Sequence, residues 1–84
     1  LPIRYWRDKA GHEIDFVIPR ARDSVDAIEC KWNPAAFEAG ALTVFRSYYP
    51  KGKNYLITPS GGPAYVRRFS KLEVKICELD GIEI

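Results

Sequence analysis

Three segments near the start of the chain alternate hydrophobic and polar side chains with the period of two that a half-buried β-strand requires. They cover residues 3–8, 12–19 and 25–32. A short loop that contains Gly11 joins the first two segments, and a charged turn at residues 20–24 joins the second to the third. Because links this tight connect antiparallel neighbours, the pattern predicts three strands paired as antiparallel hairpins.

A helical period replaces the period of two after the third segment. Asn33 stands where an N-cap is expected, and Pro34 occupies the first helical position. The sequence then predicts one helix over residues 35–49, which Pro50 and Gly52 end. Its apolar residues form a single stripe that we expect to be buried against the sheet. The stripe consists of Phe37, Ala41, Leu42, Phe45 and Tyr49.

The C-terminal part of the chain predicts further strands. Residues 53–59 read as a short buried strand, and residues 64–69 and 72–79 as two more extended segments, although a helix over residues 65–77 is the alternative. Strands on either side of a helix are usually parallel and joined by a crossover. The expected fold is therefore α/β: a mixed sheet with antiparallel hairpins followed by a parallel crossover strand, and a helix on one face.

The composition fits one small globular domain over residues 1–84. The chain is 46% hydrophobic and has a net charge of +2, which permits a nucleic-acid partner without requiring one. No apolar run is long enough to span a bilayer, so no membrane partner and a cytoplasmic location are expected. The chain contains no Met, and we expect it to be a fragment of a longer protein.

Four charged residues occupy matching positions in the second and third predicted strands. Glu13 and Asp15 share one face of the second strand, and Glu29 and Lys31 share one face of the third. The opposite faces carry apolar residues that we expect to form the core under the helix: Ile14, Phe16, Ile18, Ile28, Cys30 and Trp32. The carboxylates are then expected on the face away from the helix.

Three carboxylates on one face repel one another unless a cation lies among them. Mg²⁺, or Mn²⁺ in its place, suits such a site, because it takes oxygen ligands and needs only one or two direct carboxylates. Glu13, Asp15 and Glu29 are the candidate metal ligands. The alternative is a simple surface ion pair between Glu29 and Lys31, which contributes less than about 1 kcal/mol.

The stretch "EIDFVIP" followed by "IECKW" resembles the PD-(D/E)XK nuclease superfamily, which has the restriction-endonuclease-like fold. The resemblance implies that Asp15 and Glu29 are catalytic metal ligands, that Lys31 is the catalytic lysine, and that the backbone carbonyl of Cys30 is an additional ligand. Ile14 stands where the superfamily pattern has proline, and the helix that usually precedes the first strand is missing or lies upstream.

A narrower resemblance covers residues 4–60. "YWRDKAGHEIDFVI" followed by "IECKW" is similar to the C-terminal domain of bacterial and archaeal AAA-type ATPases. The function that these resemblances imply is a Mg²⁺-dependent nuclease-like domain that hydrolyses DNA phosphodiesters and is attached to an upstream ATPase domain of the same chain. The alternative is a catalytically inactive module of the same fold that binds nucleic acid or protein. The oligomeric state is left open.

Two other groups of side chains have alternative interpretations. Tyr48 and Tyr49, with basic residues nearby, could contact a nucleic-acid backbone, although a solvated helix end is the favoured interpretation. The basic residues are Arg46, Lys51 and Lys53. His12 is interpreted as a loop histidine rather than a ligand.

Overall fold

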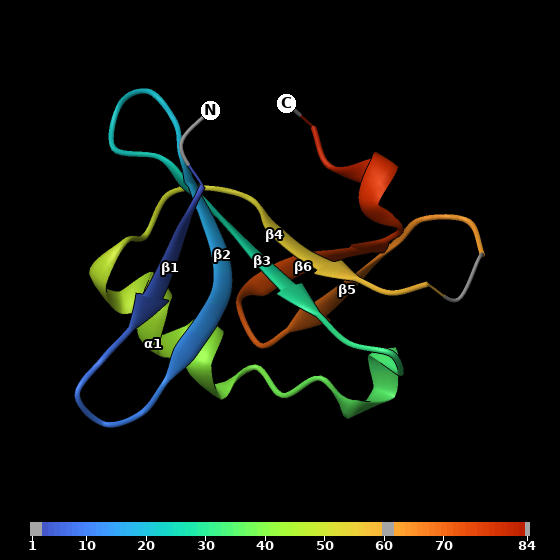
Figure 1. Cartoon of the computed structure of the whole chain (residues 1–84), viewed down its shortest axis with the longest axis horizontal. Helices are drawn as coiled ribbons and strands as arrows, with labels where there is room; N and C mark the ends of the chain where they lie inside the picture. The colour runs from blue at the N-terminus through green and yellow to red at the C-terminus, as the bar shows by residue number, and fades with distance from the viewer. Residues whose placement is uncertain (1–2, 60–61, 84) are drawn as a thin grey trace.

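The computed structural model describes residues 3–59 and 62–83. Within them, six strands form one sheet in the order β1-β2-β3-β4-β6-β5, and one α-helix packs on one face of it (Figure 1). The strands are β1 (Arg4–Arg7), β2 (Glu13–Pro19), β3 (Val25–Cys30), β4 (Asn54–Ile57), β5 (Tyr65–Phe69) and β6 (Leu72–Cys77). The helix is α1 (Gly40–Tyr48), and two 3-10 turns are η1 (Pro34–Ala36) and η2 (Leu79–Gly81).

The strands pair in the mixed pattern that the sequence predicts. β1, β2 and β3 pair antiparallel in chain order, and β4 lies parallel to β3 after the helical connection. The two C-terminal segments are strands, so the alternative of a helix over residues 65–77 is wrong. β6 is parallel to β4 and antiparallel to β5. The mixed α/β class is therefore confirmed.

The connection from β3 to β4 contains a broken helix, so the prediction of one helix over residues 35–49 is wrong. Asn33 does act as an N-cap, because its side chain accepts a hydrogen bond from the backbone N–H two residues on, but it caps only η1. Phe37 then adopts an extended conformation, and α1 begins at Gly40. We attribute the break to Phe37, whose ring packs edge-on against Phe69 of β5 with centroids 5.1 Å apart.

No helix in the described part of the chain is long and apolar enough to cross a membrane.

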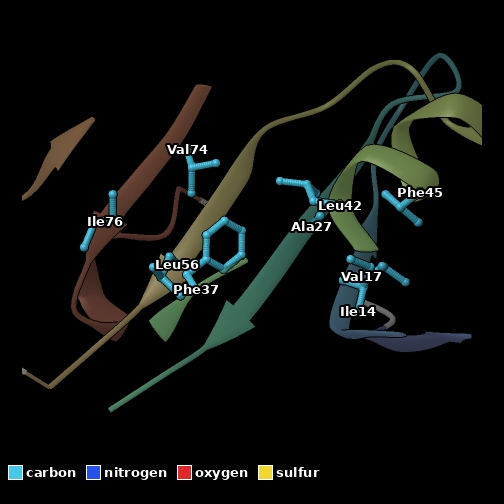
Figure 2. Close-up of a cluster of buried hydrophobic side chains, with 9 residues drawn as sticks. All are labelled: Ile14, Val17, Ala27, Phe37, Leu42, Phe45, Leu56, Val74 and Ile76. Carbon is cyan, nitrogen blue, oxygen red and sulfur yellow. The ribbon is translucent and has the colours of Figure 1, made fainter. Parts of the chain in front are cut away.

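The main hydrophobic core lies between α1 and the side of the sheet turned toward it, which we call the helix face (Figure 2). Phe37, Leu42 and Phe45 are 8%, 2% and 1% exposed, so the predicted burial of the stripe is confirmed for these three residues. Trp6 of β1 packs edge-on against Phe45, with ring centroids 5.2 Å apart. Tyr49 is largely exposed and lies outside the cluster. The sheet supplies the remaining buried members: Ile14, Val17, Ala27, Leu56, Val74 and Ile76.

The opposite face of the sheet carries a smaller buried cluster. Ile18 and Ile28 pack there with Tyr55 of β4 and Cys77 of β6. Ile82, which follows η2, packs against this cluster and partly covers it. The sheet therefore buries apolar side chains on both faces.

The predicted alternation of Ile14, Phe16 and Ile18 on one face is wrong. Between Ile14 and Val17, β2 holds one residue more than the paired segment of β1, which is a β-bulge. The extra residue changes the side-chain alternation, so Ile14 and Val17 both lie in the helix-face core. Phe16 is left 45% exposed instead of being buried.

The predicted core also extends too far at the end of β3. Ile28 is buried, but Cys30 is exposed and Trp32 is 88% exposed. β3 ends at Cys30, so Trp32 lies beyond the strand and has no neighbouring strand to cover it. The two residues are therefore surface residues and not core residues.

Arg46 is a structural residue, so neither the solvated helix end that the sequence favours nor the alternative nucleic-acid contact describes it. Its side chain is only 8% exposed, on a helix whose other polar residues are mostly exposed. The guanidinium donates hydrogen bonds of 2.8–3.1 Å to the carbonyl oxygens of Val25, Tyr49, Lys51 and Lys53 and to Oδ1 of Asn54. Burial lowers the pKa of Arg46, although the nearby charge of Asp26 raises it. Arg46 thus ties the end of α1 to the starts of β3 and β4.

Candidate functional site

The charged residues that the sequence singles out line one groove, which we call the acidic groove. It has a volume of about 640 Å³ and lies where the start of β2 and the end of β3 meet the N-terminal end of α1. Gly40 and Ala41, the first residues of α1, form part of the opposite wall. The charged lining from the strands consists of Glu13, Asp15, Glu29 and Lys31. All four side chains therefore line one groove, and the roles predicted for them stay predictions.

The face on which they gather differs from the prediction. Glu29 lies two residues after Ala27, which belongs to the helix-face core, so regular alternation places both side chains on that face. The presence of α1 residues in the wall of the same groove agrees with this placement. The expectation that the carboxylates lie on the face away from the helix is wrong, because it assigned Ile18 and Ile28 to the core under the helix, whereas both pack in the cluster on the opposite face.

Where the regular pairing of β2 and β3 ends, the side chains of Asp15 and Glu29 accept hydrogen bonds from the backbone of the neighbouring strand. The regular pairing of the two strands runs from Pro19 to Phe16 on β2. Beyond it, Asp15 N donates to Glu29 Oε1 at 2.9 Å, and Cys30 N donates to Asp15 Oδ2 at 2.9 Å. Each carboxylate is thus held by the backbone of the opposite strand. This exchange fixes the two side chains next to each other.

Asp15 lies within the β-bulge of β2. Asp15 and Phe16 are the two residues of β2 that lie opposite Tyr5 of β1, within the register shift. A bulge bends its strand and redirects side chains, and bulges are over-represented beside active sites. The Asp15 carboxylate can therefore reach the backbone of β3 at the end of the sheet.

The pKa of Glu29 is raised above its usual value of 4.5, chiefly because partial burial disfavours the charged carboxylate. The hydrogen bond from Asp15 N lowers this pKa, as does the charge of Lys31, whereas the negative charges of Asp15 and Glu13 raise it. In the metal-free protein the charge on Glu29 is therefore destabilised. A cation in the acidic groove would lower the pKa of Glu29 and favour its charged form.

Replacing Glu29 with glutamine should stabilise the metal-free protein at neutral pH. Glutamine keeps an oxygen that can accept the hydrogen bond from Asp15 N, and it carries no charge. The pKa of Glu29 is higher in the folded protein than in the unfolded protein, so ionisation of Glu29 lowers stability as the pH rises through and above 4.5. At low pH Glu29 is protonated in both the folded and the unfolded protein, and the loss disappears. The gain in urea midpoint of Glu29→Gln should therefore be larger at about pH 7 than at about pH 4.

The exposed Glu78 provides the control for this prediction. Glu78→Gln changes the net charge equally but lies outside the acidic groove. It should show no comparable gain at neutral pH. A gain of the same size for Glu29→Gln at both pH values would show that its charge is not destabilised in the folded protein.

The carboxylates of Asp15 and Glu29 suit a hydrated divalent cation. Among the described residues, no hydrogen bond reaches Oδ1 of Asp15 or Oε2 of Glu29, so each side chain has one oxygen for a ligand. The described part of the chain contains no group of three or more His, Cys, Asp or Glu side chains arranged to hold an ion. Mg²⁺ keeps several waters and needs only one or two carboxylates, whereas a structural zinc site requires four protein ligands. The pair therefore fits Mg²⁺ better than Zn²⁺.

Glu13 lies at the edge of the groove and is held by β1. Its Oε1 accepts a hydrogen bond from the hydroxyl of Tyr5 at 2.9 Å and lies 3.5 Å from Nε of Arg7. These partners compete with a cation for the carboxylate. The role of Glu13 as a metal ligand, like that of the Cys30 carbonyl, stays a prediction.

Lys31 makes no ion pair among the described residues, so the surface ion pair with Glu29 that the sequence left as an alternative is not formed there. Its positive charge nevertheless acts on Glu29, whose pKa it lowers. The ammonium is therefore near the carboxylates while remaining able to contact a ligand.

His12, which the sequence indicates is a loop histidine, lies in the loop before β2 and lines the acidic groove. Nδ1 of His12 lies 2.8 Å from Oδ2 of Asp8, and Oδ1 of Asp8 accepts a hydrogen bond from the backbone N of His12. The side chain of His12 forms part of the groove wall, with an orientation that Asp8 fixes. The spacing of four residues across a turn containing Gly11 is the signal that could have indicated the pair.

A comparison with known families identifies the family to which the chain belongs. A family model described as "Domain of unknown function (DUF4143)" matches residues 1–76, which include every residue of the acidic groove. Searches of curated proteins and of solved structures find no match. Because the matched span covers most of the 84 residues, the chain belongs to the DUF4143 family, a family of domains of unknown function.

Proposed function

We propose that the acidic groove is the metal site of a PD-(D/E)XK-type nuclease-like domain that hydrolyses DNA phosphodiesters and works with an AAA-type ATPase domain. The observation that carries this proposal is the pair of carboxylates, Asp15 and Glu29, that hold each other's strands and share a groove with Lys31. A preorganised pair of acids beside an unpaired lysine is an arrangement that phosphodiester hydrolysis can use.

The chemistry divides among the three side chains. A Mg²⁺ ion bound at the carboxylates would polarise a phosphodiester and lower the pKa of a bound water. Asp15 and Glu29 would supply the negative charge that holds it, each through the oxygen that the backbone does not use. Lys31 would orient the attacking water or neutralise charge that develops on the phosphate. In the hydrolysis the water oxygen would bond to phosphorus and give up a proton to solvent, one P–O ester bond would break, and the leaving oxygen would take up a proton from solvent.

Cleavage of DNA with and without divalent metal tests the proposal. The protein should cut DNA in Mg²⁺ or Mn²⁺ and not in EDTA. Lys31→Ala should lower the rate by about 10²–10³-fold, because removing one group that stabilises developing charge has an effect of this size. Lys71→Ala is the matched control, since Lys71 is exposed and lies outside the acidic groove, and it should cleave like the wild type. Equal rates for Lys31→Ala and the wild type would contradict the assigned role.

One observation favours the second candidate, an inactive binding module of the same fold. The described residues provide two carboxylates for a cation and no third donor in a fixed position. DNA binding that persists in EDTA, together with no cleavage in Mg²⁺ or Mn²⁺, would support this candidate over the nuclease.

A further inference from the structure

A second groove opens on the other side of Lys31, and its lining is largely apolar. It has a volume of about 440 Å³ and lies between the end of β3, the end of β4 and the start of η2. We call it the Trp32 groove. Its lining includes Cys30, Lys31, Trp32, Ile57, Pro59 and Leu79.

Trp32 is the principal feature of this groove. It is 88% exposed, more than any other large hydrophobic side chain in the described residues, and none of the aromatic contacts found among them involves it. Leu79, across the groove, is 73% exposed. An open indole face beside an apolar wall is a site on which a flat, apolar ring can stack.

Lys31 connects the Trp32 groove to the acidic groove, because it lines both. Its ammonium has no ion pair among the described residues, so a positive charge stands between the two grooves. A ligand that carries a negative charge next to a flat ring would match both features at once. One nucleotide of a DNA strand has this chemistry.

We propose that the Trp32 groove binds one unpaired base of single-stranded DNA, which stacks on the indole of Trp32 while its phosphate contacts Lys31. This inference rests on the proposed function for the choice of DNA, and it specifies the strand form that the site accepts. Stacking requires a base that is not already stacked in a duplex, and single-strand binding proteins use exposed aromatic side chains in this way.

The size of the groove agrees with a base rather than a protein partner. Small-ligand sites measure about 300–1,000 Å³, a range that includes this groove. A stable protein interface, by contrast, covers about 800 Å² on each partner. The exposed apolar lining here is confined to a few residues around Trp32.

The test measures binding of a short fluorescent oligothymidylate by anisotropy in EDTA, where no metal-dependent cleavage can contribute. Trp32→Ala should weaken binding about tenfold, the effect expected for losing one base–aromatic stack. Trp32→Phe should restore most of the affinity, because phenylalanine still offers a ring. Tyr65→Ala is the matched control: Tyr65 is 46% exposed but lines neither groove, and its removal should leave the affinity unchanged.

Two further probes separate base stacking from binding through the phosphates alone and from binding of a duplex. An abasic oligonucleotide of the same length should bind the wild type and Trp32→Ala equally, because it has phosphates but no bases. A duplex of the same sequence should bind without dependence on Trp32. The proposal is overturned if Trp32→Ala binds oligothymidylate like the wild type. It is also overturned if Trp32→Ala loses as much affinity for the abasic strand as for oligothymidylate. A wild-type dimer that Trp32→Ala dissociates, seen by ultracentrifugation, would overturn it too, because Trp32 would then be an interface residue. Because all binding is measured in EDTA, a protein that fails to cleave DNA can still support this inference.

Discussion

Phe45→Ala should lower the free energy of unfolding by about 3–5 kcal/mol, as is typical when a buried phenylalanine is truncated. Phe45 is 1% exposed and lies where α1 meets the sheet (Figure 2). Its ring centroid is 5.2 Å from that of Trp6 and 5.1 Å from that of Tyr49, so the change removes two aromatic contacts and leaves a cavity. Urea unfolding followed by circular dichroism measures the loss. The total free energy of unfolding of a domain is roughly 5–15 kcal/mol, so much of the stability depends on Phe45.

The control for this prediction is Tyr48→Ala, three residues after Phe45 on the same helix. Tyr48 is 65% exposed and makes only a tilted ring contact with Trp6. Its replacement should cost about 1 kcal/mol or less. Equal unfolding midpoints for the two variants would show that α1 does not pack on the sheet through Phe45.

Arg46→Ala should be nearly as destabilising, at about 3–5 kcal/mol, the usual cost of breaking a buried charged network. The loss has two physical causes. The variant removes the five hydrogen bonds that the guanidinium donates, and carbonyl oxygens of two chain segments, at Val25 and at residues 49–53, lose this donor. A buried acceptor that loses its donor costs about 1–3 kcal/mol.

Arg46→Lys tests whether geometry or charge is responsible. Lysine retains the charge but lacks the planar fork that reaches several carbonyls at once, so it should recover only a minor part of the loss. Arg68→Ala is the matched control, because Arg68 is exposed and its ion pair with Glu73 is exposed too. It should cost less than about 1 kcal/mol. Full recovery by Arg46→Lys would contradict the role assigned to the hydrogen-bond network.

The features that could be predicted from the sequence depend on local patterns. Alternation and turn residues located the strands to within one or two residues, and the helix between two strands indicated their parallel pairing. The burial of Phe37, Leu42 and Phe45 followed from their spacing. The gathering of Asp15, Glu29 and Lys31 followed from matching positions on adjacent strands.

The features that were missed depend on contacts between distant parts of the chain. The break in the predicted helix accompanies a contact between Phe37 and Phe69, thirty-two positions apart, which no local pattern encodes. The bulge in β2 is defined only by its pairing with β1, and it places Ile14 and Val17 together in the helix-face core. Arg46 resembled a surface arginine in the sequence, because its carbonyl partners belong to two separate segments of the backbone, at Val25 and at residues 49–53.

The thermal stability of the wild type, Glu29→Gln and Lys31→Ala, each with and without millimolar Mg²⁺ or Mn²⁺, tests the metal site most directly. A cation that binds only the folded protein raises its melting temperature, by several degrees for a domain of this size when the cation is well above its dissociation constant. We predict that the wild type and Lys31→Ala gain stability with metal, since Lys31 is not a ligand, and that Glu29→Gln gains much less. If the wild type shows no metal-dependent shift, or if Glu29→Gln shifts as much as the wild type, Asp15 and Glu29 do not form a metal site.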